Sequence, residues 1–161
     1  MNNDYLASLV LPLKNLWRTE LESGIHLKES REAFLPFDSD ELVAIIPVSG
    51  SLEGLFVYGF SKEASHYIIR RLIGPEADPF SQMALSSIGE FANIVTNNAI
   101  AALSKKGLIC KPATPIVVSP RGGSLVLDIA PHVVGRFASP IGDMHVCVGL
   151  TEQPGVHSSA A

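Results

Sequence analysis

The feature that most constrains the fold is a long helical segment in the middle of the chain. Asp78 followed by Pro79 has the pattern of a helix start, with the aspartate as N-cap and the proline in the first turn. Gly107 is expected to end this helix after Lys106. A helix of about 28 residues is roughly 42 Å long. That is long for a chain of 161 residues, a length that suits one domain. We expect a single domain over residues 1–152 and a disordered tail over residues 153–161.

The other elements indicate the fold class. Apolar residues spaced three and four apart predict an amphipathic helix over residues 5–21, bent or delayed by Pro12. Ser61 has the character of an N-cap for a helix over residues 62–73. Strands do not alternate singly with helices, which excludes a doubly wound parallel sheet. The order favours an α+β fold, a largely antiparallel sheet packed by long helices. The expected strands are residues 25–34, 42–48, 55–60, 109–118, 124–137 with an interruption at Pro131, and 144–150.

Composition excludes several classes of function. The chain is 47% hydrophobic and 17% charged, which excludes a disordered chain. Twelve basic and sixteen acidic residues give a net charge of −4 without any basic cluster, which argues against nucleic-acid binding. No apolar stretch reaches the ~20 residues that a bilayer requires, and the first residues lack a signal-peptide pattern. We therefore expect a cytoplasmic protein without membrane contact, whose Cys110 and Cys147 are buried and unpaired.

A narrow polar stripe runs along the long helix. At 100° per residue, Glu90 and Asn93 fall beside one another on the side opposite the apolar face, with ~5–6 Å between their β carbons. Ile94 and Ile100 fall on either side of the stripe. The stripe is either a solvated helix face or a docking face for another protein, since docking faces combine apolar area with fixed polar groups. Its members are Ser86, Glu90, Asn93, Asn97 and Ser104.

A glycine interrupts the helix beside this stripe. Gly89 costs ~1 kcal/mol relative to alanine inside a helix. It either allows close packing against a neighbouring element or leaves room for a partner's loop beside Glu90. Both explanations remain open from the sequence.

The stripe carries a family resemblance. Ser86-x-x-x-Glu90-x-x-Asn93 resembles the signature of the CheC/CheX/FliY family of chemotaxis phosphatases. The run Ser-Ile-Gly-Glu-Phe-Ala-Asn over residues 87–93 is most similar to the CheX branch, as is Asn98 followed by alanine. The order of elements over residues 42–152 agrees with this family, whereas the first forty residues match only as a helix followed by a strand.

The resemblance implies a chemistry and a partner. Family members hydrolyse the aspartyl phosphate of a phosphorylated CheY-like response regulator, which itself holds the Mg²⁺, so no cofactor of this chain's own is expected. By resemblance, Asn93 orients the attacking water and Glu90 pairs with the lysine of the receiver domain. Ser86 is expected either to contact the partner or Glu90, or to be an ordinary exposed serine. Partner-binding roles are also expected for the residues around the pair, namely Gly89, Ile94 and Asn97.

The sequence argues against a metal site and leaves two alternative functions open. None of the five histidines has a metal partner at helical or strand spacing, so no metal site is expected. The chain carries one motif, as in the CheX branch, and the resemblance implies a homodimer. A binding module that docks a receiver without hydrolysis is the alternative function. A purely structural dimer module is a third.

Overall fold

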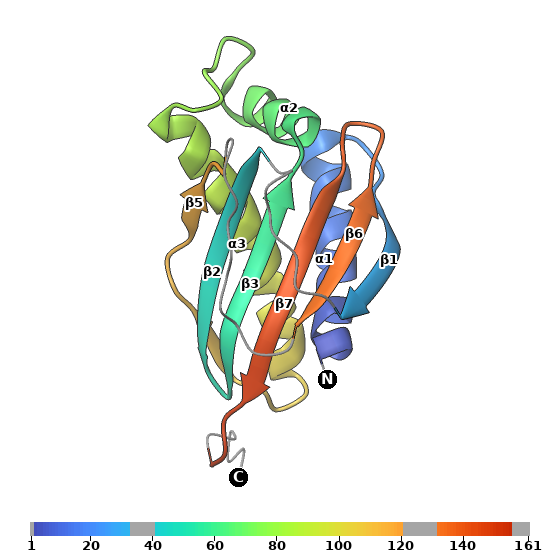
Figure 1. The fold of residues 1–161 in the computed structure, drawn as a ribbon, viewed down its shortest axis with the longest axis vertical. Coiled ribbons are helices and arrows are strands. Elements are labelled where there is room, and N and C mark those ends of the chain that lie inside the picture. The colour runs from blue at the N-terminus through green and yellow to red at the C-terminus, as the bar shows by residue number, and fades with distance from the viewer. Residues whose placement is uncertain (1, 33–40, 121–131, 156–161) are drawn as a thin grey trace.

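The computed structural model describes residues 2–32, 41–120 and 132–155. In this part of the chain, helices pack on one face of an antiparallel sheet, so the α+β class is confirmed (Figure 1). The helices are α1 (Asn2–Leu21), α2 (Lys62–Ile73) and α3 (Gln82–Ser104). The strands are β1 (His26–Glu32), β2 (Leu42–Gly50), β3 (Leu52–Phe60), β4 (Cys110–Pro112), β5 (Ile116–Val118), β6 (Val133–Ala138) and β7 (Met144–Glu152).

The sheet is built around the hairpin of β2 and β3. Its strand order is β1-β6-β7-β3-β2-β4, and β5 also pairs with β2. Strand β3 therefore has a partner along each edge, with Tyr58 opposite Ala44 of β2 and Val146 of β7. Strands β4 and β5 pair with the two ends of β2 on the same side. The centre of the sheet is thus β3, while the β4–β5 edge lies beside α3.

The core lies between this sheet and helices α1 and α3, which run side by side (Figure 1). Leu9, Leu13 and Trp17 of α1 are fully buried, as the sequence pattern predicts, whereas Leu16 is only partly buried. The Trp17 indole N–H donates to Ser139 Oγ at 3.2 Å, and its ring meets Phe91 of α3 edge to face at 5.8 Å. Each buried side chain of this size stabilises the fold by about 1.5–3 kcal/mol, so this layer holds α3 firmly on the sheet.

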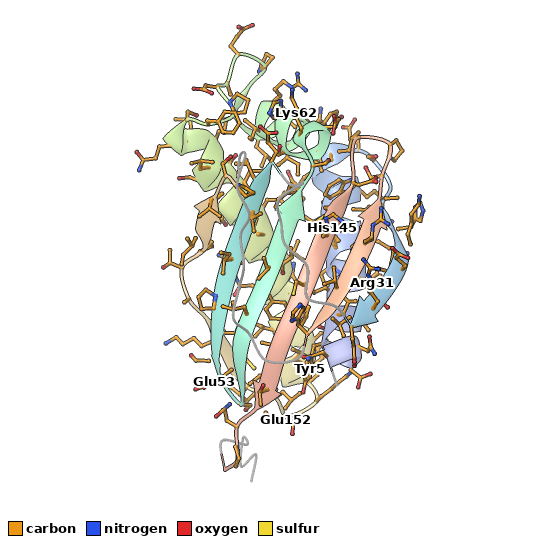
Figure 2. The ribbon with its side chains drawn as sticks, in the orientation of Figure 1. Tyr5, Arg31, Glu53, Lys62, His145 and Glu152 are labelled. Carbon is orange, nitrogen blue, oxygen red and sulfur yellow. The ribbon has the colours of Figure 1, made fainter. Side chains whose placement is uncertain are left out.

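Polar contacts tie the start of α1 to the end of β7. Tyr5 and Glu152 lie together at one end of the sheet (Figure 2), where the Tyr5 hydroxyl donates to Glu152 Oε1 at 3.5 Å. The backbone N–H of Leu150 donates to Asn2 Oδ1 at 3.1 Å. Burial, together with the negative charge of Glu152, raises the pKa of Tyr5. The first turn of α1 is therefore fixed to the closing strand.

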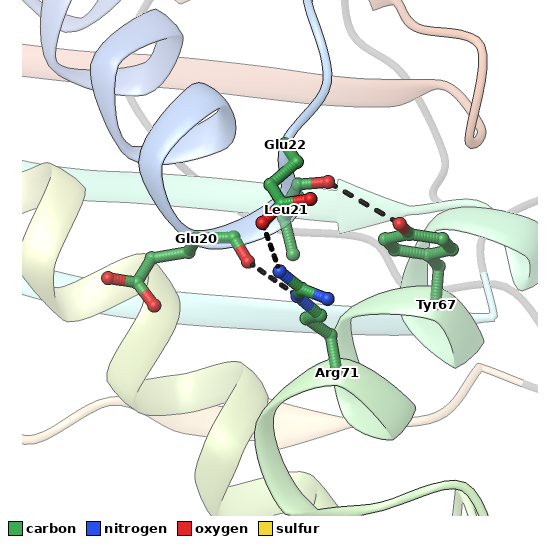
Figure 3. Close-up of polar contacts among 5 residues, drawn as sticks. All are labelled: Glu20, Leu21, Glu22, Tyr67 and Arg71. Atoms are coloured by element: carbon green, nitrogen blue, oxygen red, sulfur yellow. Dashed lines mark hydrogen bonds and ion pairs between the residues drawn. The ribbon is translucent and has the colours of Figure 1, made fainter.

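The other end of α1 is held by α2 (Figure 3). The Arg71 guanidinium donates to the Glu20 carbonyl at 3.2 Å and forms an ion pair with Glu22 Oε1 at 2.8 Å. The Tyr67 hydroxyl donates to the Leu21 carbonyl at 3.4 Å. These carbonyls belong to the last turn of a helix, where no intrahelical donor reaches them. Residues 67 and 71 of α2 thus cap α1 from a neighbouring helix.

Two expectations about elements need correction. Helix α1 begins at Asn2 and is continuous through Pro12, so the proline does not delay it, and buried residues on both sides of the proline hold the helix in the core. The strand expected over residues 109–118 is two short strands, since Pro115 has no N–H for a continuous ladder. The part of the expected strand over 124–137 that follows the interruption at Pro131 is β6, and residues 124–131 lie outside the described residues. Residues 156–161 of the expected tail also lie outside them.

Candidate functional site

The candidate site lies on α3, which starts later than expected. Ser81, not Asp78, is the N-cap, because its Oγ accepts from the backbone N–H of Ala84 at 3.1 Å. Asp78 instead closes a turn before the helix, accepting from the N–H of Phe80 at 3.0 Å. The helix ends at Ser104 and so has 23 residues. The polar stripe begins one turn after the N-cap.

The stripe lies on the outer side of α3, as the helical periodicity predicts. Glu90 and Asn97 are exposed, and Asn93 is partly exposed. Ile94 is 38% exposed and contributes an apolar side chain to the same surface. Ile100 is only 8% exposed and belongs to the core, so its expected place beside the stripe is wrong. It packs in the main hydrophobic core, a burial that the wheel alone could not identify.

The two side chains that the motif singles out have no competing partners in the described residues. Neither the Glu90 carboxylate nor the Asn93 side-chain amide forms a hydrogen bond or ion pair with another described residue. The Asn97 amide, in contrast, donates to the Asn93 backbone carbonyl at 2.9 Å. Ser86 is exposed and makes no hydrogen bond to Glu90 in this part of the chain. Glu90 and Asn93 are thus one helical turn apart and open to an approaching molecule.

Gly89 is buried beneath the stripe. A β carbon at this position would lie 3.2 Å from Val117 Cγ2 of β5 and 3.5 Å from Pro115 Cβ. The glycine therefore allows the sheet edge to pack closely against the helix, which accounts for its presence. Its expected role in binding a partner stays a prediction.

A groove runs along the surface where α3 meets this sheet edge, beside the Gly89 contact. It has a volume of about 290 Å³. Ser86 and Glu90 line it from the helix, and Thr114 lines it from the segment before β5. The sequence pattern could not identify the second wall, because that wall comes from a segment more than twenty residues away. The full lining is Gln82, Leu85, Ser86, Gly89, Glu90, Thr114, Pro115 and Val117.

The described part of the chain holds neither a metal-binding cluster nor a membrane-spanning helix. In residues 2–32, 41–120 and 132–155, no group of three or more His, Cys, Asp or Glu side chains could hold a metal ion. None of the described helices is long and apolar enough to cross a bilayer. The arrangement on α3 is thus a carboxylate and an amide presented together on a protein surface. These groups can accept from a lysine or a water and donate to an anionic oxygen.

Comparison with protein families identifies the chain. The family model for the chemotaxis phosphatase CheX matches residues 42–135. The chain belongs to the CheX family. The CheY-P phosphatase CheX of Thermotoga maritima is 32% identical over 81 residues, which are 50% of this chain and 52% of that protein. The match thus spans about half the length of this curated relative.

Solved structures of CheX proteins share the fold. The chemotaxis protein CheX from Desulfovibrio desulfuricans has a TM-score of 0.80 and 18% identity, over 93% of this chain and 99% of that chain. The CheX-CheY-BeF3-Mg²⁺ complex from Borrelia burgdorferi has a TM-score of 0.75 and 18% identity, over 92% of this chain and 98% of that chain. Both likenesses extend to the first forty residues, where the sequence offered little support.

Proposed function

We propose that this CheX-family protein hydrolyses the aspartyl phosphate of a phosphorylated CheY-like receiver domain. The observation that carries the proposal is the pair of Glu90 and Asn93, one turn apart on the outer side of α3 and without internal partners. Family membership and the relative named as a CheY-P phosphatase support the same reaction. The Borrelia burgdorferi complex of CheX with CheY supports a receiver as the partner.

Asn93 acts on the water. Its carboxamide oxygen accepts a hydrogen bond from the water, and its NH₂ group donates to a phosphoryl oxygen. The water oxygen then forms a bond to phosphorus while the bond between phosphorus and the aspartate oxygen breaks. The products are the carboxylate of the receiver's aspartate, which leaves with the electron pair of the broken bond, and inorganic phosphate, which keeps both protons of the water. A neutral amide suits this task, because a carboxylate in its place would repel the phosphoryl group.

Glu90 fixes the docking register. Its exposed carboxylate pairs with the lysine beside the receiver's phosphorylation site. This charge-assisted hydrogen bond holds Asn93 where its amide can place the attacking water in line with the phosphorus. The receiver supplies the Mg²⁺ that neutralises the phosphoryl oxygens. This chain needs only to supply position, since an acyl phosphate is already reactive. Ser86, Ile94 and Asn97 form the surface around the pair and contact the receiver.

The experiment is the decay of a phosphorylated receiver from the same organism with Mg²⁺, with and without this protein. Positioning of the water should accelerate decay by about one to several orders of magnitude. We expect Asn93→Ala to abolish the acceleration while retaining binding to the receiver, and Glu90→Ala to weaken binding. Asn98→Ala is the matched control, because Asn98 is an exposed asparagine of α3 that lines a different groove, beside α1.

The outcomes separate the possible functions. Binding of a receiver with unchanged decay would overturn the phosphatase and favour a binding module that docks receivers. Equal activity in the Asn93→Ala and Asn98→Ala variants would overturn the assigned site. The family resemblance also implies a homodimer, for which sedimentation should report twice the chain mass of 17.2 kDa.

A further inference from the structure

A buried hydrogen-bond chain links the centre of the sheet to the helical turn that carries Asn93. The hydroxyl groups of Tyr58 and Thr96 lie 2.6 Å apart, and both side chains are 0% exposed. Thr96 Oγ1 also lies 2.9 Å from the backbone carbonyl of Ala92. The chain therefore ends at the peptide group that joins Ala92 to Asn93.

Chemistry sets the direction of this chain. The Ala92 carbonyl can only accept, so the single hydroxyl proton of Thr96 is donated to it. The Tyr58 hydroxyl must then donate to Thr96 Oγ1. Burial, as the main cause, raises the pKa of Tyr58 far above its usual value. The phenol thus keeps its proton across the pH range of an enzyme assay, and the chain stays intact.

The same turn is braced from the solvent side. The Asn97 side-chain amide donates to the Asn93 carbonyl at 2.9 Å. The carbonyls of residues 92 and 93 thus each accept a side-chain hydrogen bond from the residue four positions later, in addition to the helical ladder. A threonine bond of this kind bends a helix locally. The Thr96 and Asn97 bonds thus constrain two adjacent carbonyls of this turn.

Tyr58 is a firm anchor for this chain. It lies in β3, which is paired along both edges, with Ala44 and Val146 as its neighbours in register. Its hydroxyl reaches across the core to Thr96 on the buried side of α3, and Asn93 lies three residues earlier, about 60° around the same helix and partly exposed. A rotation of α3 about its axis would break the bond between Tyr58 and Thr96, and it would move Asn93 by the same angle.

We propose that Tyr58 and Thr96 are positioning residues, which hold the Asn93 turn at the rotation needed to place the attacking water. The proposal rests on the proposed phosphatase function. Neither residue touches the receiver, because both side chains are fully buried. Their effect reaches the reaction only through the backbone of residues 92 and 93. The hydroxyl group of each residue is therefore the feature to remove.

The test compares kcat and KM for receiver dephosphorylation in hydroxyl-deletion variants. We expect Tyr58→Phe and Thr96→Val to lower kcat by about tenfold or more, because a small displacement of a positioning group is costly. KM should stay within about twofold, because Glu90 and the docking surface are unchanged. Thr96→Ser keeps the hydroxyl and should restore most of kcat.

A stability control separates positioning from general destabilisation. Ser65 of α2 is also 0% exposed, and its hydroxyl donates to the Lys62 carbonyl at 3.1 Å. Ser65→Ala should reduce the free energy of unfolding while leaving kcat unchanged. If Tyr58→Phe and Thr96→Val also destabilise the protein but keep full kcat, the hydrogen-bond chain is merely structural and the proposal is overturned.

A second measurement does not depend on the phosphatase activity. Backbone amide chemical shifts of residues 90–97 should change in Tyr58→Phe and not in Ser65→Ala. If the wild-type protein does not accelerate receiver decay, the proposed function fails, and these shifts alone decide whether the chain positions the turn. Unchanged shifts in Tyr58→Phe would then overturn the inference.

Discussion

Gly89 of α3 packs against Val117 of β5 so closely that a β carbon on the glycine would lie 3.2 Å from the valine Cγ2 atom. This contact brings the sheet edge against the helix immediately beside Glu90. The groove at Glu90 consequently has one wall from α3 and one from the segment before β5. The glycine therefore affects the site indirectly, by allowing the sheet edge to pack against α3.

A larger side chain at Gly89 should therefore destabilise the fold. Gly89→Leu must displace Val117 and Pro115, and we expect a loss of about 1–3 kcal/mol in the free energy of unfolding. Urea denaturation measures the loss. Ala101→Leu is the matched control, because Ala101 is exposed on the same helix and should tolerate leucine. Equal stability of the two variants would show that the contact with β5 does not constrain residue 89.

The cap of α1 by Arg71 leads to a second prediction. Arg71→Ala removes the donor to the Glu20 carbonyl and the ion pair with Glu22, whose side chain is 74% exposed. An exposed ion pair contributes only about 0–1 kcal/mol, so we expect a total loss of about 1–2 kcal/mol with the carbonyl bond included. Thermal denaturation checks this. Arg70→Ala should cost less, because within the described residues the Arg70 guanidinium bonds to the His66 carbonyl of its own helix and to no other element.

The two cysteines should differ in reactivity. Burial raises the pKa of Cys147 to about 12, so almost none of this thiol is ionised at pH 8. Cys110 is only partly buried, although burial raises its pKa as well. A thiol reagent should modify Cys110 slowly in the native protein and reach Cys147 only after denaturation. Mass spectrometry of the labelled native protein checks this order. Modification of Cys147 before Cys110 would contradict it.

The labelling of Cys147 should depend on pH differently in the native and the unfolded protein, because only the native state buries this thiol. The native state holds the Cys147 proton up to about pH 12, whereas the unfolded thiol loses it near its ordinary value of 9.0. Labelling of the unfolded protein should therefore rise steeply through pH 9, while native Cys147 stays protected. Modification of native Cys147 at pH 9 at the rate seen in denaturant would show that the thiol is accessible.

Local pattern determined much of this protein. The spacing of apolar residues placed Glu90 and Asn93 on the outer side of a helix, because helical periodicity depends only on neighbours a few residues away. The bounds of α2 follow from its serine N-cap and its closing glycine in the same way. The motif around Glu90, together with the order of elements, indicated the CheX family, to which the chain belongs.

Only the tertiary structure decided which neighbours these residues meet. Whether Ile100 faces solvent or the core depends on how α3 is rotated against the sheet, and the structure buries it. The packing of Gly89 on Val117 joins segments 28 residues apart, and the bond between Tyr58 and Thr96 joins segments 38 residues apart. Such contacts arise when separate elements pack, and the free energy that selects one packing is shared over the whole core. No local sequence pattern therefore predicts which packing is selected.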